Sequence, residues 1–475
     1  MSCFGEFLPG TQVFVSIVKH VPPSFVRILM KQRFLPLAML ALNLCLIGVT
    51  IAQQSAVDFF NNGITKSKTG DFTGALQAFN MAITVNPENS ASYYNRGLVK
   101  ANLKDHRGAV VDYDRAIELD TKDALAYLSR GLSKSKQDDH REALLDYSRS
   151  IELNPDDAQT YYNRGISRNQ VEQYRGALAD FTKTIELDPA NVQAYYVRGV
   201  TKQKLGDFSG SLSDFARVIE VAPKRPLAYA SRGISRVELN EFAGAIADLS
   251  KAIELNPEDG ESHYYRGFAK SKIEDYKGAL TDYDQILRLM ANNYPAFYGR
   301  GFCRSKLGDQ KGAIQDFNQA ISIDNDNVEP KVVYSGRMTR TSLDNLRNAV
   351  QDRNKISEMG MERAEAYFGR GVSRSKQGDQ KMALSDFNKA IELNPTYAEA
   401  YFSRGTIKSG QGDQKAAIMD YNNAVKLNPR FAEAYYVRGL IKYSLGDSNG
   451  GCLDLSKAGE LGYTPSYKAI SDYCN

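Results

Sequence analysis

The sequence predicts an all-α solenoid, an array of stacked helix pairs, from three observations. Glycine recurs every 34 residues, and the same step resumes after one longer gap. A small residue follows twelve positions after each glycine, as Ala109 follows Gly97. An Asn-Pro or Asp-Pro step closes many of the segments. Regularity of this kind is typical of repeat arrays. The recurring glycines are Gly63, Gly97, Gly131, Gly165, Gly199, Gly233, Gly267, Gly301, Gly371, Gly405 and Gly439.

The N-terminal stretch differs from the array and has the order of an export signal. Residues 34–52 are uncharged and apolar, and basic residues stand just ahead of them. A basic region, an apolar region and a small-residue exit define a signal peptide, so we expect one over residues 30–52, cleaved after Ala52. Residues 1–29 are then an upstream extension from a misplaced start. The alternative is an uncleaved membrane anchor, because about 18 to 20 apolar residues can just span a bilayer.

Each 34-residue segment contains two amphipathic helices joined by a tight turn. A Gly-Asp step such as Gly70-Asp71 lies between them: glycine accepts the left-handed conformation that ends one helix, and aspartate caps the next. Proline, as at Pro87, ends the pair because it cannot continue the hydrogen-bond ladder. In residues 90–123, apolar or small residues at helical spacing are Tyr93, Tyr94, Gly97 and Leu98, then Ala109, Tyr113, Ala116 and Ile117.

This order of aromatic, glycine, alanine, aromatic, alanine and proline over 34 residues resembles the tetratricopeptide repeat, from residue 56 onward. The resemblance implies a right-handed α-solenoid of helix-turn-helix units with a C-terminal capping helix. We expect eight regular units over residues 56–327, a degenerate unit over 328–363, three units over 364–465 and a cap over 464–475. The glycine-to-alanine spacing of the degenerate unit is thirteen instead of twelve, so we expect a helix pair with weaker packing there.

Two rows of opposite charge follow the repeat. Arginine precedes the repeat glycine, as at Arg96, a basic residue follows four positions later, as at Lys100, and aspartate precedes the second-helix aromatic, as at Asp112. In the first unit Asn62 and Ala78 replace arginine and aspartate together. We interpret the rows as an internal Arg–Asp ladder that clamps neighbouring helices. The alternative is a charge ladder that binds a ligand.

The first helices of such a solenoid line its concave side, the usual binding surface. Helical geometry places the second, fifth, sixth, ninth and thirteenth positions of a unit on one side. Aromatic rings there supply apolar area, amides can hold a peptide backbone, and lysines favour acidic side chains. The alternative is that individual rings only pack against the next repeat. The predicted partner-binding residues are Tyr94, Asn95, Lys136, Tyr162, Asn163, Tyr196, Lys204, Tyr264, Lys272, Tyr298, Lys306, Phe368, Lys376, Phe402 and Tyr436.

The sequence offers no chemistry of its own. It has no Gly-rich phosphate loop, nucleophile elbow or zinc-type Cys/His cluster, so we expect no catalytic residue, metal or cofactor. His106 and His140 occupy equivalent positions one repeat apart, roughly 10 Å, which is too far for shared metal ligation. The 60 basic and 56 acidic residues give a net charge of +4, nearly balanced outside the N-terminal stretch, which argues against nucleic acid as a partner.

Cysteine spacing predicts one disulfide. Cys452 falls on the second helix of the last unit and Cys474 near the C-terminus, at a similar height on antiparallel helices. An exported compartment would permit their oxidation. The alternative is two free thiols. Cys303 is expected to be a small buried filler.

These observations together predict a non-enzymatic scaffold that is exported to the periplasm, the cell surface or the medium. Its expected partners are extended peptides or protein segments held in the concave groove. Two alternatives stay open: a membrane-tethered envelope assembly factor, and an array that binds glycan or peptidoglycan by stacking sugars on the aromatic row.

Overall fold

The computed structural model describes residues 54–323 and 351–474, which are helical with no strand among them. The chain divides between Asn191 and Val192 into two compact units, and each is described by itself. The expectations for residues 1–29 and 30–52 lie outside the described residues. No helix within the described ranges is both long enough and apolar enough to cross a lipid bilayer.

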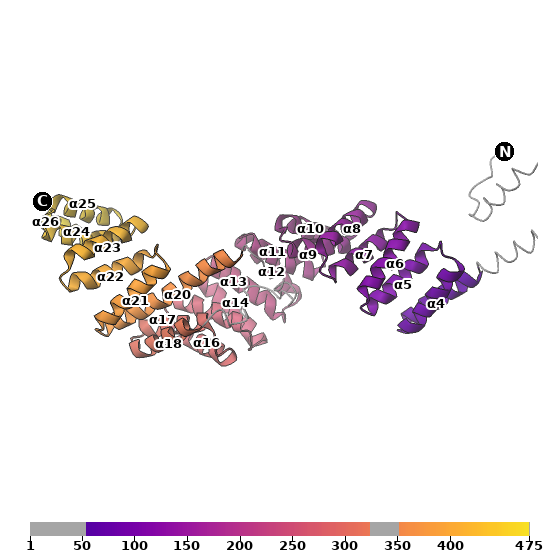
Figure 1. The fold of residues 1–475 in the computed structure, drawn as a ribbon, viewed down its shortest axis with the longest axis horizontal. Helices are drawn as coiled ribbons and strands as arrows, with labels where there is room; N and C mark the ends of the chain where they lie inside the picture. Colours follow the sequence, from indigo (N-terminus) through magenta and orange to yellow (C-terminus); the bar gives the residue numbers. More distant parts are fainter. Residues whose placement is uncertain (1–53, 324–350, 475) are drawn as a thin grey trace, which may run out of the picture. The chain divides into compact units, whose positions relative to one another are not determined.

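The N-terminal unit is a series of helix pairs in which consecutive helices run in opposite directions (Figure 1). Residues 54–68 form the first helix, which precedes α4. The following helices begin at the residues that open each 34-residue register, which confirms the two-helix repeat. They are α4 (Phe72–Val85), α5 (Ser90–Asn102), α6 (His106–Leu119), α7 (Ala124–Ser135), α8 (His140–Leu153), α9 (Ala158–Gln170) and α10 (Tyr174–Leu187).

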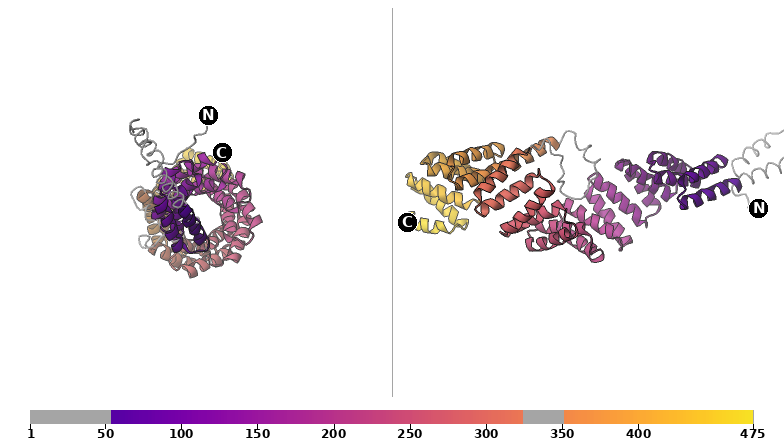
Figure 2. Two further views of the ribbon diagram at one scale, coloured as in Figure 1. Left: turned by 90° about the vertical axis from the view of Figure 1, so that its right-hand side faces the viewer. Right: turned by 90° about the horizontal axis from the view of Figure 1, so that it is seen from below.

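The C-terminal unit continues the same pairing and ends in a short helix (Figures 1 and 2). Its helices are α11 (Val192–Lys204), α12 (Phe208–Val221), α13 (Pro226–Glu238), α14 (Phe242–Leu255), α15 (Gly260–Lys272), α16 (Tyr276–Leu289), α17 (Tyr294–Lys306), α18 (Gln310–Ser322), α20 (Gln351–Lys376), α21 (Gln380–Leu393), α22 (Ala398–Gly410), α23 (Gln414–Leu427), α24 (Ala432–Ser444), α25 (Ser448–Glu460) and α26 (Pro465–Tyr473).

Glycine and alanine allow the two helices of a pair to approach closely. A Cβ added at Gly97 would lie 2.6 Å from the ring of Tyr113 on the second helix, so any larger residue would displace that ring. Ala109, on the opposite helix, is fully buried. The small residues of the sequence pattern therefore mark the seam of each pair, and the second-helix aromatic fills it.

The turns between paired helices follow the predicted chemistry. Gly70 has φ +84°, in the left-handed region, and the Asp71 side chain accepts a hydrogen bond from the Gly74 N–H at 2.8 Å. Several units place other residues at the glycine position with φ of 59° to 67°, namely Lys104, Asp138, Glu172, Asn240 and Glu274. These units keep the same turn although a side chain makes the left-handed conformation less favourable.

The segment between the eighth and the following regular unit differs from expectation. Most of residues 328–363 lies outside the described range, and residues 351–363 continue without a break into the helix of the next unit as α20. That helix packs directly on the preceding pair: Ser373 Oγ lies 3.1 Å from Ser305 Oγ, and Arg370 donates to Asn318 at 2.7 Å. The expectation of a degenerate helix pair stacked at this point is therefore wrong, because the neighbouring regular unit occupies that place.

The C-terminal helix covers the end of the last pair, as predicted. α26 lies against α25 (Figure 1), and the Tyr467 hydroxyl donates to the Gly459 carbonyl at 3.0 Å. Cys452 and Cys474 form the predicted disulfide, with an S–S distance of 2.03 Å. Cys303 is buried as a free thiol, and burial raises its pKa to about 12.

Candidate partner-binding face

The charged rows form buried triads within each helix pair. Arg96 donates to both carboxylate oxygens of Asp112, at 2.9 and 2.6 Å, and Lys100 lies 2.8 Å from the same carboxylate. The Asp112 side chain is only 2% exposed. The same triad recurs at Arg130–Asp146–Lys134, Arg164–Asp180–Arg168, Arg198–Asp214–Lys202, Arg232–Asp248–Arg236, Arg266–Asp282–Lys270, Arg300–Asp316–Arg304, Arg370–Asp386–Arg374, Arg404–Asp420–Lys408 and Arg438–Asp454–Lys442.

The arginine of each triad also joins neighbouring units. Its guanidinium lies over the ring at the fourth position, as Arg96 lies 5.5 Å from the centre of Tyr93, and it donates to Asn80 of the preceding pair at 2.7 Å. Equivalent bridges to the preceding second helix are Arg130–Asp114, Arg164–Ser148, Arg266–Ser250, Arg300–Asp284, Arg370–Asn318, Arg404–Asn388 and Arg438–Asn422. The interpretation of an internal ladder is confirmed, and these residues are framework.

One triad gains a histidine. His263 takes the fourth position of its unit, is 6% exposed, and places Nδ1 3.2 Å from Asp282 and Nε2 3.1 Å from the Pro257 carbonyl. Both ring nitrogens thus face oxygen acceptors, which only the doubly protonated ring satisfies fully. Burial alone would raise the pKa of Asp282, but hydrogen bonds from His263, Arg266 and Lys270 lower it to about 2.

The predicted aromatic row lies half-buried on the first helices. Each ring packs on one side against the second helix of its own pair, so the row is braced by the framework. Ring-centre distances are 5.9 Å for Tyr94–Tyr113, 6.0 Å for Tyr162–Phe181, 5.9 Å for Tyr196–Phe215, 6.5 Å for Tyr264–Tyr283, 6.0 Å for Tyr298–Phe317, 5.7 Å for Phe368–Phe387 and 5.6 Å for Phe402–Tyr421. Tyr436 packs instead on Tyr463, at 5.0 Å.

The predicted lysines are exposed at the ends of the first helices, as the row requires. Two of them lie over rings that the predicted set omitted: the Lys272 ammonium is 5.0 Å from the centre of Phe268, and that of Lys306 is 5.5 Å from Phe302. Phe302 is itself 37% exposed. We call the exposed residues Lys204, Lys272, Lys306 and Lys376 of the C-terminal unit the lysine edge.

The predicted asparagines are engaged within their own helix. Asn95 donates from Nδ2 to the Ala91 carbonyl at 2.8 Å, and Asn163 accepts a hydrogen bond from Gln159 at 3.2 Å. These contacts use part of the amide capacity that was expected to hold a peptide backbone. Both asparagines, with Tyr94, Lys136 and Tyr162, lie in the N-terminal unit, while the other predicted residues belong to the C-terminal unit.

The two equivalent histidines are packing residues. His140 Nδ1 lies 3.2 Å from Ser135 Oγ and 3.4 Å from Ser167 Oγ, and burial lowers the pKa of its imidazole. Across residues 54–323 and 351–474, no group of three or more His, Cys, Asp or Glu side chains is arranged to hold a metal ion.

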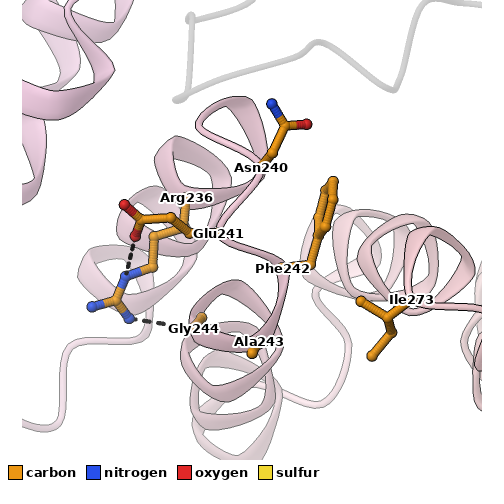
Figure 3. Close-up of a pocket in the computed structure, with 7 residues that line it drawn as sticks. All are labelled: Arg236, Asn240, Glu241, Phe242, Ala243, Gly244 and Ile273. Carbon is orange, nitrogen blue, oxygen red and sulfur yellow. Dashed lines mark hydrogen bonds and ion pairs between the residues drawn. The ribbon is translucent and has the colours of Figure 1, made fainter. Parts of the chain in front are cut away.

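A shallow hollow of about 450 Å³ lies where the turn between α13 and α14 meets the turn after α15 (Figure 3). Arg236 at its wall donates to the Gly244 carbonyl at 3.2 Å and lies 3.8 Å from Glu241. Ile273, from the next unit, is 51% exposed. None of the predicted binding residues lines this hollow, whose lining residues are Arg236, Asn240, Glu241, Phe242, Ala243, Gly244 and Ile273.

A second set of rings was missed by the sequence analysis. Tyr397 and Phe431, each just before a first helix, pack on the fifth-position rings Phe368 and Phe402 with centres 4.9 Å apart. Most other units carry a polar or charged residue at this position, often an N-cap such as Asn293. The 34-residue step that revealed the aromatic row also joins Tyr397 to Phe431, so the signal was present in the sequence.

Comparison with known proteins agrees with this architecture. Profiles described as tetratricopeptide repeat or TPR repeat match residues 60–124 and 200–259, 130–198, 294–327, 364–397, 387–419 and 410–446. Together these matches span well over half of the chain. No curated protein matches the chain significantly.

Several solved structures are similar to parts of the chain. MamA from Desulfovibrio magneticus RS-1 is 23% identical, with a TM-score of 0.34, over 35% of this chain and 94% of that one. A tetratricopeptide repeat protein from Parabacteroides merdae is 18% identical, with a TM-score of 0.43, over 60% and 98%. The C-terminal part of a TPR repeat-containing protein from Cytophaga hutchinsonii is 17% identical, with a TM-score of 0.45, over 50% and 98%. From the repeat profiles and the helix pairs described above, the chain belongs to the tetratricopeptide repeat family.

Proposed function

We propose that this chain is an exported scaffold that binds extended segments of partner proteins along the first helices of its units. Membership of the tetratricopeptide repeat family supports a role in protein–protein interaction. The observation that carries the finer proposal is the row of half-exposed rings, each braced against a second-helix ring. Rings already held in place lose little conformational freedom on binding, so their apolar area contributes efficiently to affinity.

The lysine edge sets the chemistry of the partner in the C-terminal unit. Lys272 and Lys306 stand beside the exposed faces of Phe268 and Phe302, which places a cation next to apolar area in two successive units. A segment that alternates apolar and acidic side chains matches this pattern. Adjacent helices pack about 8 to 10 Å apart, and an extended chain rises about 3.3 Å per residue, so every third residue of the segment meets an equivalent position.

Binding of a synthetic extended peptide, with aspartate and phenylalanine repeating every third residue, tests the proposal. We expect the doubly substituted variant Lys272→Ala, Lys306→Ala to bind about tenfold more weakly by fluorescence anisotropy, because both cations are lost. Lys389→Ala with Lys457→Ala is the matched control, since those lysines lie on second helices and pair with Glu392 and Glu460. Equal loss in both variants, or binding that neither changes, contradicts the proposed groove.

Export is supported by the disulfide between Cys452 and Cys474, because such bonds persist in oxidising compartments. Mass spectrometry of the mature protein from its native cells tests this part of the proposal. We expect the mature chain to begin at Gln53. A chain that retains residues 34–52 and sediments with membranes supports the tethered alternative instead.

A further inference from the structure

Three exposed glutamates line one end of the first helices in the last three units. Glu365 on α20, Glu399 on α22 and Glu433 on α24 each take the second position of a unit and recur every 34 residues. We call them the carboxylate edge. They lie eleven residues from the thirteenth position, which carries the lysine edge, and this is roughly 16 Å along a helix at about 1.5 Å per residue. The two edges are therefore separate surfaces.

The carboxylate edge is not neutralised like the other acidic residues of the array. Glutamates on the second helices pair with a basic residue three positions earlier, as Glu392 pairs with Lys389 at 2.6 Å and Glu460 with Lys457 at 2.9 Å. Glu399 and Glu433 form no ion pair with any residue in the described part of the chain. Their charges are thus available to a partner.

Each glutamate stands beside a pair of aromatic rings. The pairs are Phe368–Tyr397, Phe402–Phe431 and Tyr436–Tyr463, with ring centres 4.9, 4.9 and 5.0 Å apart and all six rings half-buried. The carboxylates act on the hydroxyls among them: burial and then Glu365 and Glu399 raise the pKa of Tyr397, and burial and then Glu433 raise that of Tyr463. The edge therefore repeats a unit of one carboxylate and two rings.

The chain itself shows which group a carboxylate and a ring hold together. Arg438 lies 5.3 Å from the centre of Tyr435 and binds Asp454, as the arginine does in the other triads. Moreover, Arg225, at the position where the last units carry their second ring, lies 4.6 Å from the centre of Tyr196. Guanidinium suits such sites because it is planar and always charged, stacks on rings, and binds carboxylates with two hydrogen bonds.

We propose that the carboxylate edge and its ring pairs bind an extended basic segment of a partner protein, with an arginine at about every third residue. Each arginine stacks on one ring pair and pairs with the adjacent glutamate, and successive arginines reach successive units. This inference rests on the proposed function, since it assigns a second segment chemistry to the first-helix face. The occupant is basic because three unneutralised carboxylates repel an acidic segment.

The test is binding of a synthetic peptide with arginine at every third residue, separated by glycine and serine, to the purified full chain. The variant Glu365→Gln, Glu399→Gln, Glu433→Gln keeps side-chain shape and removes the charges. We expect at least about tenfold weaker binding of the arginine peptide, a loss that shrinks as salt concentration rises. The control Glu392→Gln, Glu460→Gln changes glutamates on second helices and is expected to bind as the parent does.

A ring variant tests the other half of the site. Phe431→Asn removes one ring but introduces an N-cap residue, as Asn293 caps α17, so the start of α24 is preserved. We expect severalfold weaker binding of the arginine peptide, with unchanged helix content by circular dichroism. A peptide of the same composition with its arginines contiguous is expected to bind more weakly than the spaced peptide.

The outcomes separate this inference from the proposed function. Binding of the arginine peptide that is unchanged in the triple glutamine variant, or no binding of that peptide at all, overturns the inference. If the aspartate–phenylalanine peptide still binds and still depends on Lys272 and Lys306, the proposed function stands without it. If the triple glutamine variant loses both peptides equally, the glutamates are structural and the inference fails.

Discussion

Two rows of carboxylates in this protein differ only in where the repeat places them. The aspartates of the triads are 0 to 8% exposed, and each contacts two basic side chains at 2.5 to 2.9 Å. The glutamates of the carboxylate edge are exposed, and Glu399 and Glu433 have no ionic partner among the described residues. The comparison teaches that a periodic charge marks framework when its counter-charge repeats with it, and an available surface when it does not.

Removing a triad aspartate is expected to give the largest effect. Asp420→Ala leaves Arg404 and Lys408 partly buried without their acceptor, which we expect to cost about 3 to 5 kcal/mol of local stability. Hydrogen exchange of α22 and α23 measures this locally, because unfolding of a long array need not be two-state. Glu392→Ala, an exposed partner of Lys389, serves as the control with an expected loss below about 1 kcal/mol. Similar losses at both sites would remove the distinction between the rows.

Opening the disulfide is expected to affect the exposed row and leave the triads intact. Replacing Cys452 and Cys474 by serine removes a cross-link between residues 22 apart in sequence, worth about 3 kcal/mol to the terminal cap. Loosening of the cap frees Tyr463 from Tyr436, so we expect faster exchange in α25 and α26 with unchanged protection of α22 and α23. Reductant is expected to reproduce the effect in the parent chain and to do nothing further in the double serine variant.

Acid is expected to distinguish the triad that contains histidine. The folded pKa of Asp282, about 2, lies below the ordinary value of about 3.9. The carboxylate therefore contributes stability above about pH 4, roughly 2 kcal/mol, which is lost as the pH falls toward 2. His263→Phe removes one hydrogen bond and is expected to start this loss at a higher pH, measured by hydrogen exchange of α15 and α16. Tyr367→Phe, in a unit without the histidine, should leave its own acid profile unchanged.

The smallest stability effect is expected on the carboxylate edge itself. Glu399→Gln removes an exposed charge that has no ionic partner among the described residues, so we expect a change in unfolding free energy within about 0.5 kcal/mol by urea denaturation. A loss of several kcal/mol would show that this row is framework as well, and would contradict its availability to a partner.

Much of this architecture could be predicted because its contacts are local. Gly97 and Tyr113, or Arg96 and Asp112, are separated by sixteen residues within one unit, so each pair of partners recurs with the repeat and is visible in the sequence. The same holds for Cys452 and Cys474, whose separation spans a single turn. The binding residues were less predictable, because the half-buried rings look alike in sequence whether they serve packing or a partner.

By itself the sequence determined the helix pair, its turn, the Arg–Asp ladder and the terminal cross-link, since each depends on partners at a constant short spacing. Only the tertiary structure decided which pair follows α18, because the contact of Ser373 with Ser305 joins residues 68 apart across a segment that breaks the period. It also decided which carboxylates stay exposed, since exposure depends on the basic side chains that neighbouring helices bring within reach. A repeated letter specifies a repeated position, and packing specifies what that position meets.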